Sequence, residues 1–331
     1  METGGKVLLA DIGGTNARFA LAEAGADAPL LEDSVRKYPV TAYPSLADAA
    51  KKYLQETGAS ASHGVFAVAA TIEGDQARMT NHPWVFSRSR LCQQLGLGQA
   101  LLVNDFVAQA MAIPLLRAGD YAVIGGAAWD PDRDHGDRIQ AVIGPGTGLG
   151  VGGLVVRDGQ EHPVYTEGGH VSFAPGTLEE VAILERLSAQ FDRVSTERLV
   201  CGPGLVNIHH ALDEIAGEDP GEITPPAIIE RARAGDPRCR QAVDVFCAVF
   251  GAIAGDLVLT LGAWQGVFLT GGMVPAMLEE LRHSRFRQRF EHKGRFSPTM
   301  EAVPTVAVLH PQPGLLGAAA IARREARRTS G

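Results

Sequence analysis

Short apolar runs of strand length alternate along this chain with longer segments whose apolar residues recur at helical spacing. The runs lie at residues 7–10, 65–70, 101–103, 141–143, 267–269 and 306–309. Strands that alternate with amphipathic helices are typical of α/β proteins. The pattern therefore predicts an α/β fold.

Two of the helical segments are especially clear. Thr177 and Glu180 have the spacing of a capping box and predict a helix start. The apolar face that we expect on this helix consists of Val181, Leu184, Leu187 and Phe191. A second helix is predicted over about 240–261. Its uncharged part, 245–255, is shorter than the roughly 20 residues of a membrane span, so we expect it to be buried in the protein.

One strand–turn–strand pattern occurs twice. Residues 9–21 read as a strand, a glycine turn and a second strand, and residues 141–155 repeat this order. Gly13, Gly14 and Thr15 in the first copy correspond to the segment Pro145-Gly-Thr147 in the second. Related segments in two halves of a chain predict a duplicated fold.

Composition narrows the class of protein. The chain has 331 residues, 45% of them apolar, and a net charge of −8. This length favours two domains. The negative charge disfavours binding to nucleic acid or to a membrane surface, so we expect neither as a partner. The first apolar run ends at Asp11, too short for a signal peptide, which predicts a cytoplasmic protein with reduced cysteines.

Glycine-rich turns are the first candidate for chemistry. They occur at residues 13–14, 144–153 and 271–272, each beside a predicted strand. Such turns let backbone N–H groups approach a phosphate, although a single one is more often an ordinary hairpin turn. Residues 148–153 match the dinucleotide fingerprint, but a strand follows where that motif requires a helix. The chain also lacks a Walker loop, so we expect a different kind of nucleotide site.

Several motifs together resemble one family over nearly the whole chain. They are Asp11-Ile-Gly-Gly-Thr-Asn-Ala-Arg18, Asn104-Asp105-Phe106, Gly146-Thr-Gly-Leu-Gly150, Glu167-Gly-Gly-His170, Gly202-Pro-Gly-Leu-Val-Asn207 and Leu269-Thr-Gly-Gly-Met-Val-Pro275. Their order and approximate spacing resemble the proteobacterial-type glucokinases. The resemblance implies a two-domain, duplicated actin-like ATPase (ribonuclease H-like) fold with an interdomain cleft, and ATP-dependent phosphorylation of D-glucose to glucose 6-phosphate.

The same resemblance implies a nucleotide site made mainly of main-chain groups. Its ATP-binding residues are Ala10, Asp11, Ile12, Gly13, Gly14, Thr15, Gly146, Thr147, Gly148, Gly271 and Gly272. Asp11 would also lie near a Mg²⁺ ion, although a strand-end carboxylate that accepts from turn amides fits its position as well. A bulky residue at Gly271 is expected to weaken ATP binding more than sugar binding, whereas equal effects would indicate a packing role.

Asp105 is the candidate general base. It follows a predicted strand and precedes a predicted helix, a position that suits either a ligand-binding edge of an α/β sheet or a plain helix N-cap. The resemblance of Asn104-Asp105 to the family's pair favours catalysis. It implies that Asp105 accepts the proton of the sugar's 6-hydroxyl and that Asn104 orients the ring.

The resemblance assigns three further residues to glucose: Glu167, His170 and Glu197. Glu167 and His170 flank two glycines, which predicts a loop from which both can point into one cleft, whereas on a helix the same spacing would indicate a surface pair. By spacing alone, Glu197 fits a carboxylate at a helix start. The nearby segment Asn81-His-Pro-Trp84 resembles the sugar side of the family's cleft, but it also fits an ordinary packed loop.

We expect the smaller domain to comprise residues 1–115 and 314–331 and the larger domain residues 116–313. Relatives are commonly dimers, so a homodimer is expected. The alternatives are a kinase for fructose, mannose or an N-acetylhexosamine, and a non-catalytic sugar sensor on the same fold. A chaperone-type ATPase is a third class, and it would hydrolyse ATP without sugar.

Overall fold

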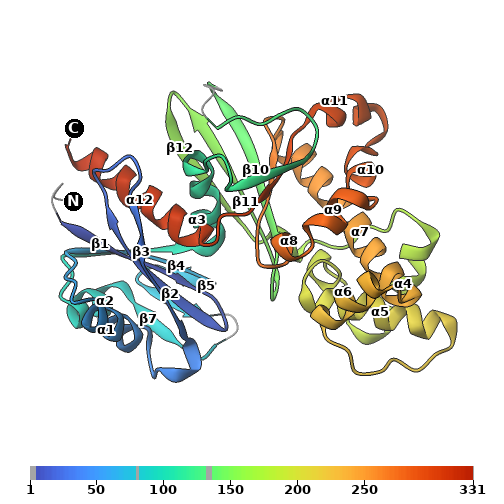
Figure 1. Cartoon of the computed structure of the whole chain (residues 1–331), viewed down its shortest axis with the longest axis horizontal. Coiled ribbons are helices and arrows are strands. Elements are labelled where there is room, and N and C mark those ends of the chain that lie inside the picture. The colour runs from blue at the N-terminus through green and yellow to red at the C-terminus, as the bar shows by residue number, and fades with distance from the viewer. Residues whose placement is uncertain (1–4, 80–81, 132–135, 331) are drawn as a thin grey trace. The chain divides into compact units, whose positions relative to one another are not determined.

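The computed structural model describes residues 5–79, 82–131 and 136–330 and divides into two compact units (Figure 1). The first unit comprises residues 1–117 together with 310–331, and the second comprises residues 118–309. These bounds differ by two to four residues from those expected from the sequence.

The first unit is built on a five-stranded sheet in the order β3-β2-β1-β4-β8. The strands are β1 (Lys6–Ile12), β2 (Asn16–Glu23), β3 (Leu30–Pro39), β4 (His63–Val68) and β8 (Gln99–Asn104), and β5 (Ala70–Glu73), β6 (Gln76–Met79) and β7 (Val85–Ser87) form a small second sheet. The helices are η1 (Val40–Ala42), α1 (Leu46–Thr57), α2 (Arg88–Leu95), α3 (Asp105–Ala112), η2 (Ile113–Leu115) and α12 (Pro313–Ser330). The predicted strand 65–70 therefore ends at Val68, and Ala70 begins β5.

Helices pack on both sides of this sheet. Helices α1 and α2 lie on one side and α3 and α12 on the other (Figure 1). Ser45 caps the first turn of α1, and Gly58 ends that helix with a φ of +61°. Helix α12 passes so close to α3 that a side chain on Gly317 would collide with the carbonyl of Ala108. The last helix of the chain therefore completes the core of the first unit.

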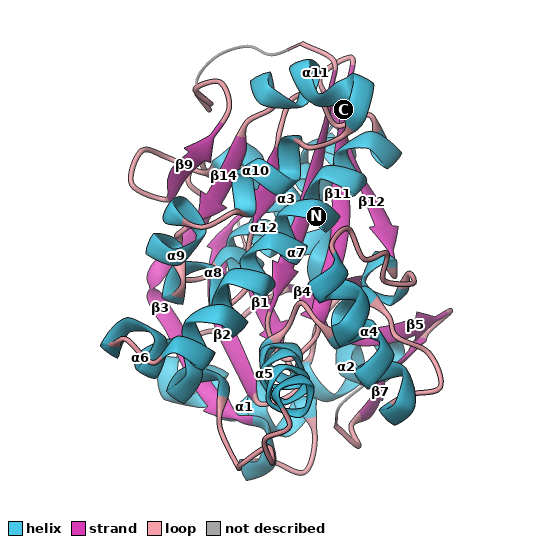
Figure 2. Cartoon of the chain, turned by 90° about the vertical axis from the view of Figure 1, so that its right-hand side faces the viewer, coloured by secondary structure: helices cyan, strands magenta, loops and turns pink. Residues whose placement is uncertain are grey.

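The second unit contains a six-stranded sheet in the order β12-β11-β10-β13-β14-β9. The strands are β9 (Tyr121–Gly125), β10 (Arg138–Pro145), β11 (Leu149–Arg157), β12 (Gln160–Thr166), β13 (Val267–Leu269) and β14 (Thr305–Val308). The helices are η3 (Gly168–His170), α4 (Leu178–Gln190), η4 (Thr196–Arg198), α5 (Gly202–Ala216), α6 (Pro225–Ala234), α7 (Pro237–Leu261), α8 (Met273–Ala276), α9 (Leu278–His283), α10 (Phe286–Glu291), η5 (Gly294–Phe296) and α11 (Ser297–Ala302). Figure 2 shows the edge strand β9 beside its neighbour β14.

The two sheets share one plan. In the first, β1 is antiparallel to β2 and parallel to β4, and β4 is parallel to β8. In the second, β10 is antiparallel to β11 and parallel to β13, and β13 is parallel to β14. The outer strands β3 and β12 are antiparallel to β2 and β11. The strand–turn–strand repeat in the sequence is thus the central hairpin of each half, which confirms the expected α/β, duplicated fold.

The buried face of α4 differs from the one expected. Thr177 does cap the helix, because its hydroxyl accepts from the N–H of Glu180 at 3.1 Å. However, Val181 is 38% exposed, whereas Ile183 and the carboxylate-bearing Glu180 are buried. Arg289 of α10 pairs with Glu180 at 2.7 Å, and this ion pair draws the glutamate into the core. The apolar pattern alone could not reveal that partner.

Helix α7 is the long apolar helix predicted near the C-terminus. Among the described residues it is long and apolar enough to cross a membrane, but 67% of its most apolar window is buried inside the protein. Asp236 caps its start by accepting from the N–H of Cys239 at 2.9 Å. The helix supplies many residues of the second unit's core, and the expectation that it is buried is confirmed.

Candidate active site

The first glycine turn joins β1 to β2. The N–H of Gly13 donates to the carbonyl of Asn16 at 3.0 Å and closes the turn. Ala10 and Ile12 are fully buried in the middle strand of the sheet, where their main chain pairs with both neighbouring strands. Of the residues expected to bind ATP here, Gly14 and Thr15 therefore lie at the tip of the turn, whereas Ala10 and Ile12 mainly support it.

Asp11 lies at the end of β1, largely shielded from solvent. Burial raises the pKa of its carboxyl group, while Arg18, at 3.5 Å, partly offsets this effect. Gly314, in the first turn of α12, has no room for a side chain, because a Cβ atom would lie 2.7 Å from the carboxyl carbon of Asp11. Sequence reasoning missed Arg18, although a hairpin closed by Gly13 and Asn16 places positions 11 and 18 opposite each other.

Asn104 and Asp105 lie where β8 passes into α3. Asn104 is the N-cap, and its Oδ1 atom accepts from the N–H of Phe106 at 2.8 Å. Asp105 is the first helical residue, and its Oδ1 atom also accepts from Phe106, at 3.0 Å. The capping role thus belongs mainly to Asn104, whose side-chain NH₂ group is the part suited to donate to a ligand.

The second glycine turn joins β10 to β11. The N–H of Gly146 donates to the carbonyl of Gly148 at 2.8 Å, and Gly202 at the start of α5 donates to the carbonyl of Gly146 at 2.8 Å. Thr147 is exposed at the tip. This loop, residues 146–148, has the same position in its sheet as the turn 13–15 in the first unit. We call it the phosphate loop, after the role that the sequence predicts for it.

The motif Glu167-Gly-Gly-His170 packs against the strand that leaves the phosphate loop. A side chain on Gly169 would collide with the carbonyl of Leu149, and one on Gly168 would lie 2.9 Å from Val151. The glycines therefore allow η3 to approach β11 closely. Glu167 and His170, at the two ends of this turn, are both exposed.

Glu197 lies between the phosphate loop and His170. Its Oε2 atom accepts from the N–H of Leu149 at 2.8 Å, and its Oε1 atom lies 4.0 Å from Nδ1 of His170. A side chain on Gly148 would collide with the same carboxylate. The structure thus brings together an expected sugar ligand of η3, one of η4 and the phosphate loop, all within the second unit.

Gly271 and Gly272 follow β13 but differ in their surroundings. Gly271 has a φ of +85°, and a Cβ atom there would lie 2.6 Å from the carbonyl oxygen of Pro145. Gly272 is exposed, and a Cβ atom there would meet nothing within 4 Å. A side chain at Gly271 would therefore disturb the packing in any case, so an effect on ATP binding is better tested at Gly272.

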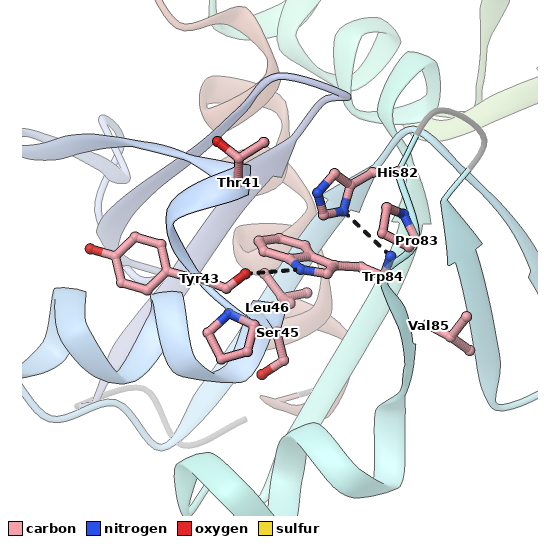
Figure 3. Close-up of a pocket in the computed structure, with 9 residues that line it drawn as sticks. Thr41, Tyr43, Ser45, Leu46, His82, Pro83, Trp84 and Val85 are labelled. Carbon is pink, nitrogen blue, oxygen red and sulfur yellow. Dashed lines mark hydrogen bonds between the residues drawn. The ribbon is translucent and has the colours of Figure 1, made fainter.

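A cavity of about 560 Å³ lies in the first unit between the start of α1 and the segment before β7 (Figure 3). The indole N–H of Trp84 donates to the carbonyl of Tyr43 at 3.3 Å, and the Trp84 side chain is 5% exposed. His82 accepts from the N–H of Trp84 at 3.4 Å. His82 to Trp84 thus form a packed loop, and Asn81 lies outside the described residues.

Few protein groups are available to hold a metal. Among the described residues, no cluster of three or more His, Cys, Asp or Glu side chains has the arrangement of a metal site. Mg²⁺ needs fewer, because one or two carboxylates usually hold it together with water and substrate phosphates. The shielded carboxylate of Asp11, beside the first glycine turn, fits that requirement.

Comparisons with known proteins agree on one family. The glucokinase family model matches residues 8–325. A glucokinase of Stenotrophomonas maltophilia is 64% identical over 316 residues, which cover 96% of this chain and 94% of the relative.

Solved structures are also similar. A glucokinase from an Antarctic psychrotroph is 33% identical, with a TM-score of 0.84 over 97% of this chain and 99% of that one. A ROK family glucokinase from Streptomyces griseus, solved with glucose and AMPPNP, shares the fold at 22% identity, with a TM-score of 0.65 over 97% of this chain and 100% of that one. The matches extend over both units and all the motifs described above, and the chain therefore belongs to the glucokinase family.

Proposed function

We propose that this protein transfers the γ-phosphoryl group of ATP to the 6-hydroxyl of D-glucose. The observation that carries the proposal is the position of Glu197, which lies 4.0 Å from an expected sugar ligand, His170, and accepts from the N–H of Leu149 at the base of the phosphate loop. A kinase needs its acceptor and its phosphate donor at adjoining sites, because the enzyme's main task is to align them.

Asp105 acts in this proposal as the general base. Its carboxylate accepts the proton of the 6-hydroxyl as the oxygen attacks phosphorus, and ADP leaves with the former bridging oxygen. Asn104 donates from its amide to a sugar hydroxyl, since its Oδ1 atom is engaged in capping α3. Glu167, His170 and Glu197 accept from or donate to the other hydroxyls.

The glycine turns bind the phosphates through backbone N–H groups. Gly14 and Thr15 serve in the first unit, Gly146, Thr147 and Gly148 in the second, and Gly272 makes room for the nucleoside. Asp11 would hold Mg²⁺, which supplies charge neutralisation at the β- and γ-phosphates. Arg18 keeps the carboxylate of Asp11 oriented through their contact of 3.5 Å.

The experiment that tests this function measures ADP release with ATP and Mg²⁺ against glucose, fructose, mannose and N-acetylated hexosamines. We expect glucose to give the largest kcat/KM and a reaction without sugar to give almost none. A larger value for another hexose would reassign the substrate. Sugar-independent hydrolysis would indicate an ATPase, and binding of sugar without turnover would indicate a sensor.

We also propose that the protein is a cytoplasmic homodimer. Relatives of this family commonly form dimers, and no role on nucleic acid or membranes is part of the proposal. Light scattering behind a sizing column tests the dimer: the expected mass is twice the 35.0 kDa of one chain.

A further inference from the structure

Two short segments of the second unit hold the base of the phosphate loop between them. The N–H of Leu149 donates to Glu197 of η4 at 2.8 Å, and its carbonyl lies against Gly169 of η3. Thr196 ties the two segments together, because its hydroxyl donates to the carbonyl of Gly169 at 2.7 Å. The segments that carry the expected sugar ligands therefore also position the loop.

The carboxylate of Glu197 lies between the phosphate loop and the expected sugar ligand His170. Oε2 is engaged with Leu149, while Oε1 lies 4.0 Å from Nδ1 of His170, too far for a direct hydrogen bond. The side chains of Glu197 and His170 are 30% and 57% exposed, so this side of the carboxylate is open to a ligand. A sugar hydroxyl between them can donate to Oε1 without disturbing the bond at Oε2, since an ionised carboxylate accepts through both oxygens.

The surroundings of Gly148 are consistent with this arrangement. Its φ lies outside the left-handed region, so its backbone conformation does not demand glycine. A Cβ atom there would instead collide with Oε2 of Glu197. A side chain at position 148 would therefore displace the carboxylate from its present place against the loop.

We propose that Glu197 is a positioning residue for the phosphate loop as well as a sugar ligand, and that its carboxylate couples sugar binding to nucleotide binding. The proposal rests on the function proposed above. A bound sugar restricts the Glu197 side chain to the rotamer that accepts from Leu149, so part of the entropy cost of ordering the loop is met before the nucleotide arrives. Linkage then requires that nucleotide strengthen sugar binding by the same factor.

The test measures the Kd of Mg²⁺-AMPPNP by calorimetry, with and without glucose, for the wild type and three variants. We expect glucose to lower this Kd by about fivefold or more in the wild type. Glu197→Ala should raise the sugar-free Kd about tenfold and abolish the coupling, because the N–H of Leu149 loses its acceptor. Glu197→Gln keeps an acceptor oxygen and should raise the sugar-free Kd by less than about threefold.

His170→Gln is the matched control. It removes a sugar ligand whose contact is with Oε1 rather than with the loop, so it should weaken glucose binding yet leave the sugar-free Kd for nucleotide within about twofold. The proposal is overturned if Glu197→Ala weakens glucose binding but binds nucleotide without sugar as tightly as the wild type. In that case Glu197 is a sugar ligand alone.

A second pair of variants approaches the same contact from the loop. Gly148→Ala should displace the carboxylate and raise the Kd of glucose, measured without nucleotide, by about fivefold. Gly146→Ala places its Cβ atom in open space and should leave that constant within about twofold. Equal glucose constants for the two variants contradict the coupling. Should Glu197→Ala melt below the assay temperature, the pair is compared by the ratio of the glucose Kd without and with Mg²⁺-AMPPNP, and the coupling predicts a smaller ratio for Gly148→Ala than for Gly146→Ala.

These outcomes separate the coupling from the proposed function. If the wild type binds neither glucose nor Mg²⁺-AMPPNP, the proposed function fails. If the wild type binds both ligands and the variants show the same nucleotide Kd with and without glucose as the wild type, only the coupling fails.

Discussion

At the scale of single residues, the candidate site consists of side chains whose roles depend on neighbours a few ångströms away. Asn104 takes the capping role at the start of α3, and Asp105 follows it as the first helical residue. Gly271 and Gly272 are adjacent in sequence, yet one packs against Pro145 and the other borders open space.

The first prediction concerns Asp105. Asp105→Asn should leave the glucose Kd within about tenfold and lower kcat by roughly 10²-fold or more, because the amide cannot accept the proton of the hydroxyl. Stopped-flow or coupled assays measure kcat, and calorimetry measures Kd. Asp48→Asn is the control, since Asp48 is also an acidic residue in the first turn of a helix, α1. A fully active Asp105→Asn variant would exclude the base role.

The second prediction compares two adjacent glycines. Gly271→Ala should lower the free energy of unfolding by about 1–2 kcal/mol or more, because an L-residue is strained at a φ of +85°. Gly272→Ala adopts an ordinary φ of −65° and should unfold like the wild type, but should raise the Kd of Mg²⁺-AMPPNP more than that of glucose. Thermal unfolding and calorimetry measure the two effects. Equal changes in both binding constants for Gly272→Ala would remove it from the nucleotide site.

At the scale of elements, long-range partners decided which face of a helix is buried. In α4, the carboxylate of Glu180 accepts two bonds from Arg289, at 2.7 and 3.1 Å, and one from the N–H of Gly176 at 2.6 Å. A buried, hydrogen-bonded ion pair is costly to break from one side, because the remaining charge stays buried without its partner.

The third prediction tests this pair. Arg289→Met should destabilise the protein by about 3–5 kcal/mol, and Glu180→Gln should also destabilise it. The double variant should lose less stability than the sum of the two single variants, because no charge is then left uncompensated. Urea unfolding of all four proteins measures the coupling. Strict additivity would mean that the ion pair contributes nothing beyond the separate side chains.

At the scale of the whole molecule, two units with one sheet plan are each stabilised by a core of their own. The second unit also includes a buried polar cluster between α5 and the start of α7. His209, 8% exposed, lies 3.1 Å from Asp213, and Arg238 contacts the same carboxylate at 2.9 Å. Burial lowers the pKa of His209, and this outweighs the opposite effect of Asp213.

The fourth prediction is the pH dependence that this histidine confers on unfolding. A folded-state pKa below the unfolded value of about 6.5 means that the unfolded chain binds the proton more readily. The stabilisation is thus fully present above about pH 6.5 and is lost as the pH falls through the folded-state pKa. Unfolding free energies between pH 7 and pH 5 should fall less steeply for His209→Gln, by up to about 1.4 kcal/mol per pH unit. An identical slope for both proteins would contradict this assignment.

The sequence by itself determined the main strands, two of the helices, the internal repeat and the family. These follow from local patterns: apolar runs make strands, capping residues such as Thr177 begin helices, and the motifs around Asp11 and Gly146 specify the two central hairpins. Each of these features depends on residues close together in the chain, so the local sequence pattern is sufficient to predict them.

Only the tertiary structure decided which distant groups meet. The partner of Glu180 is 109 residues away, and the carboxylate that holds the N–H of Leu149 is 48 residues away. The packing role of Gly271 likewise depends on a carbonyl of another strand. A buried carboxylate is stable only with such a partner, and the pattern of neighbouring residues does not say which distant segment supplies it.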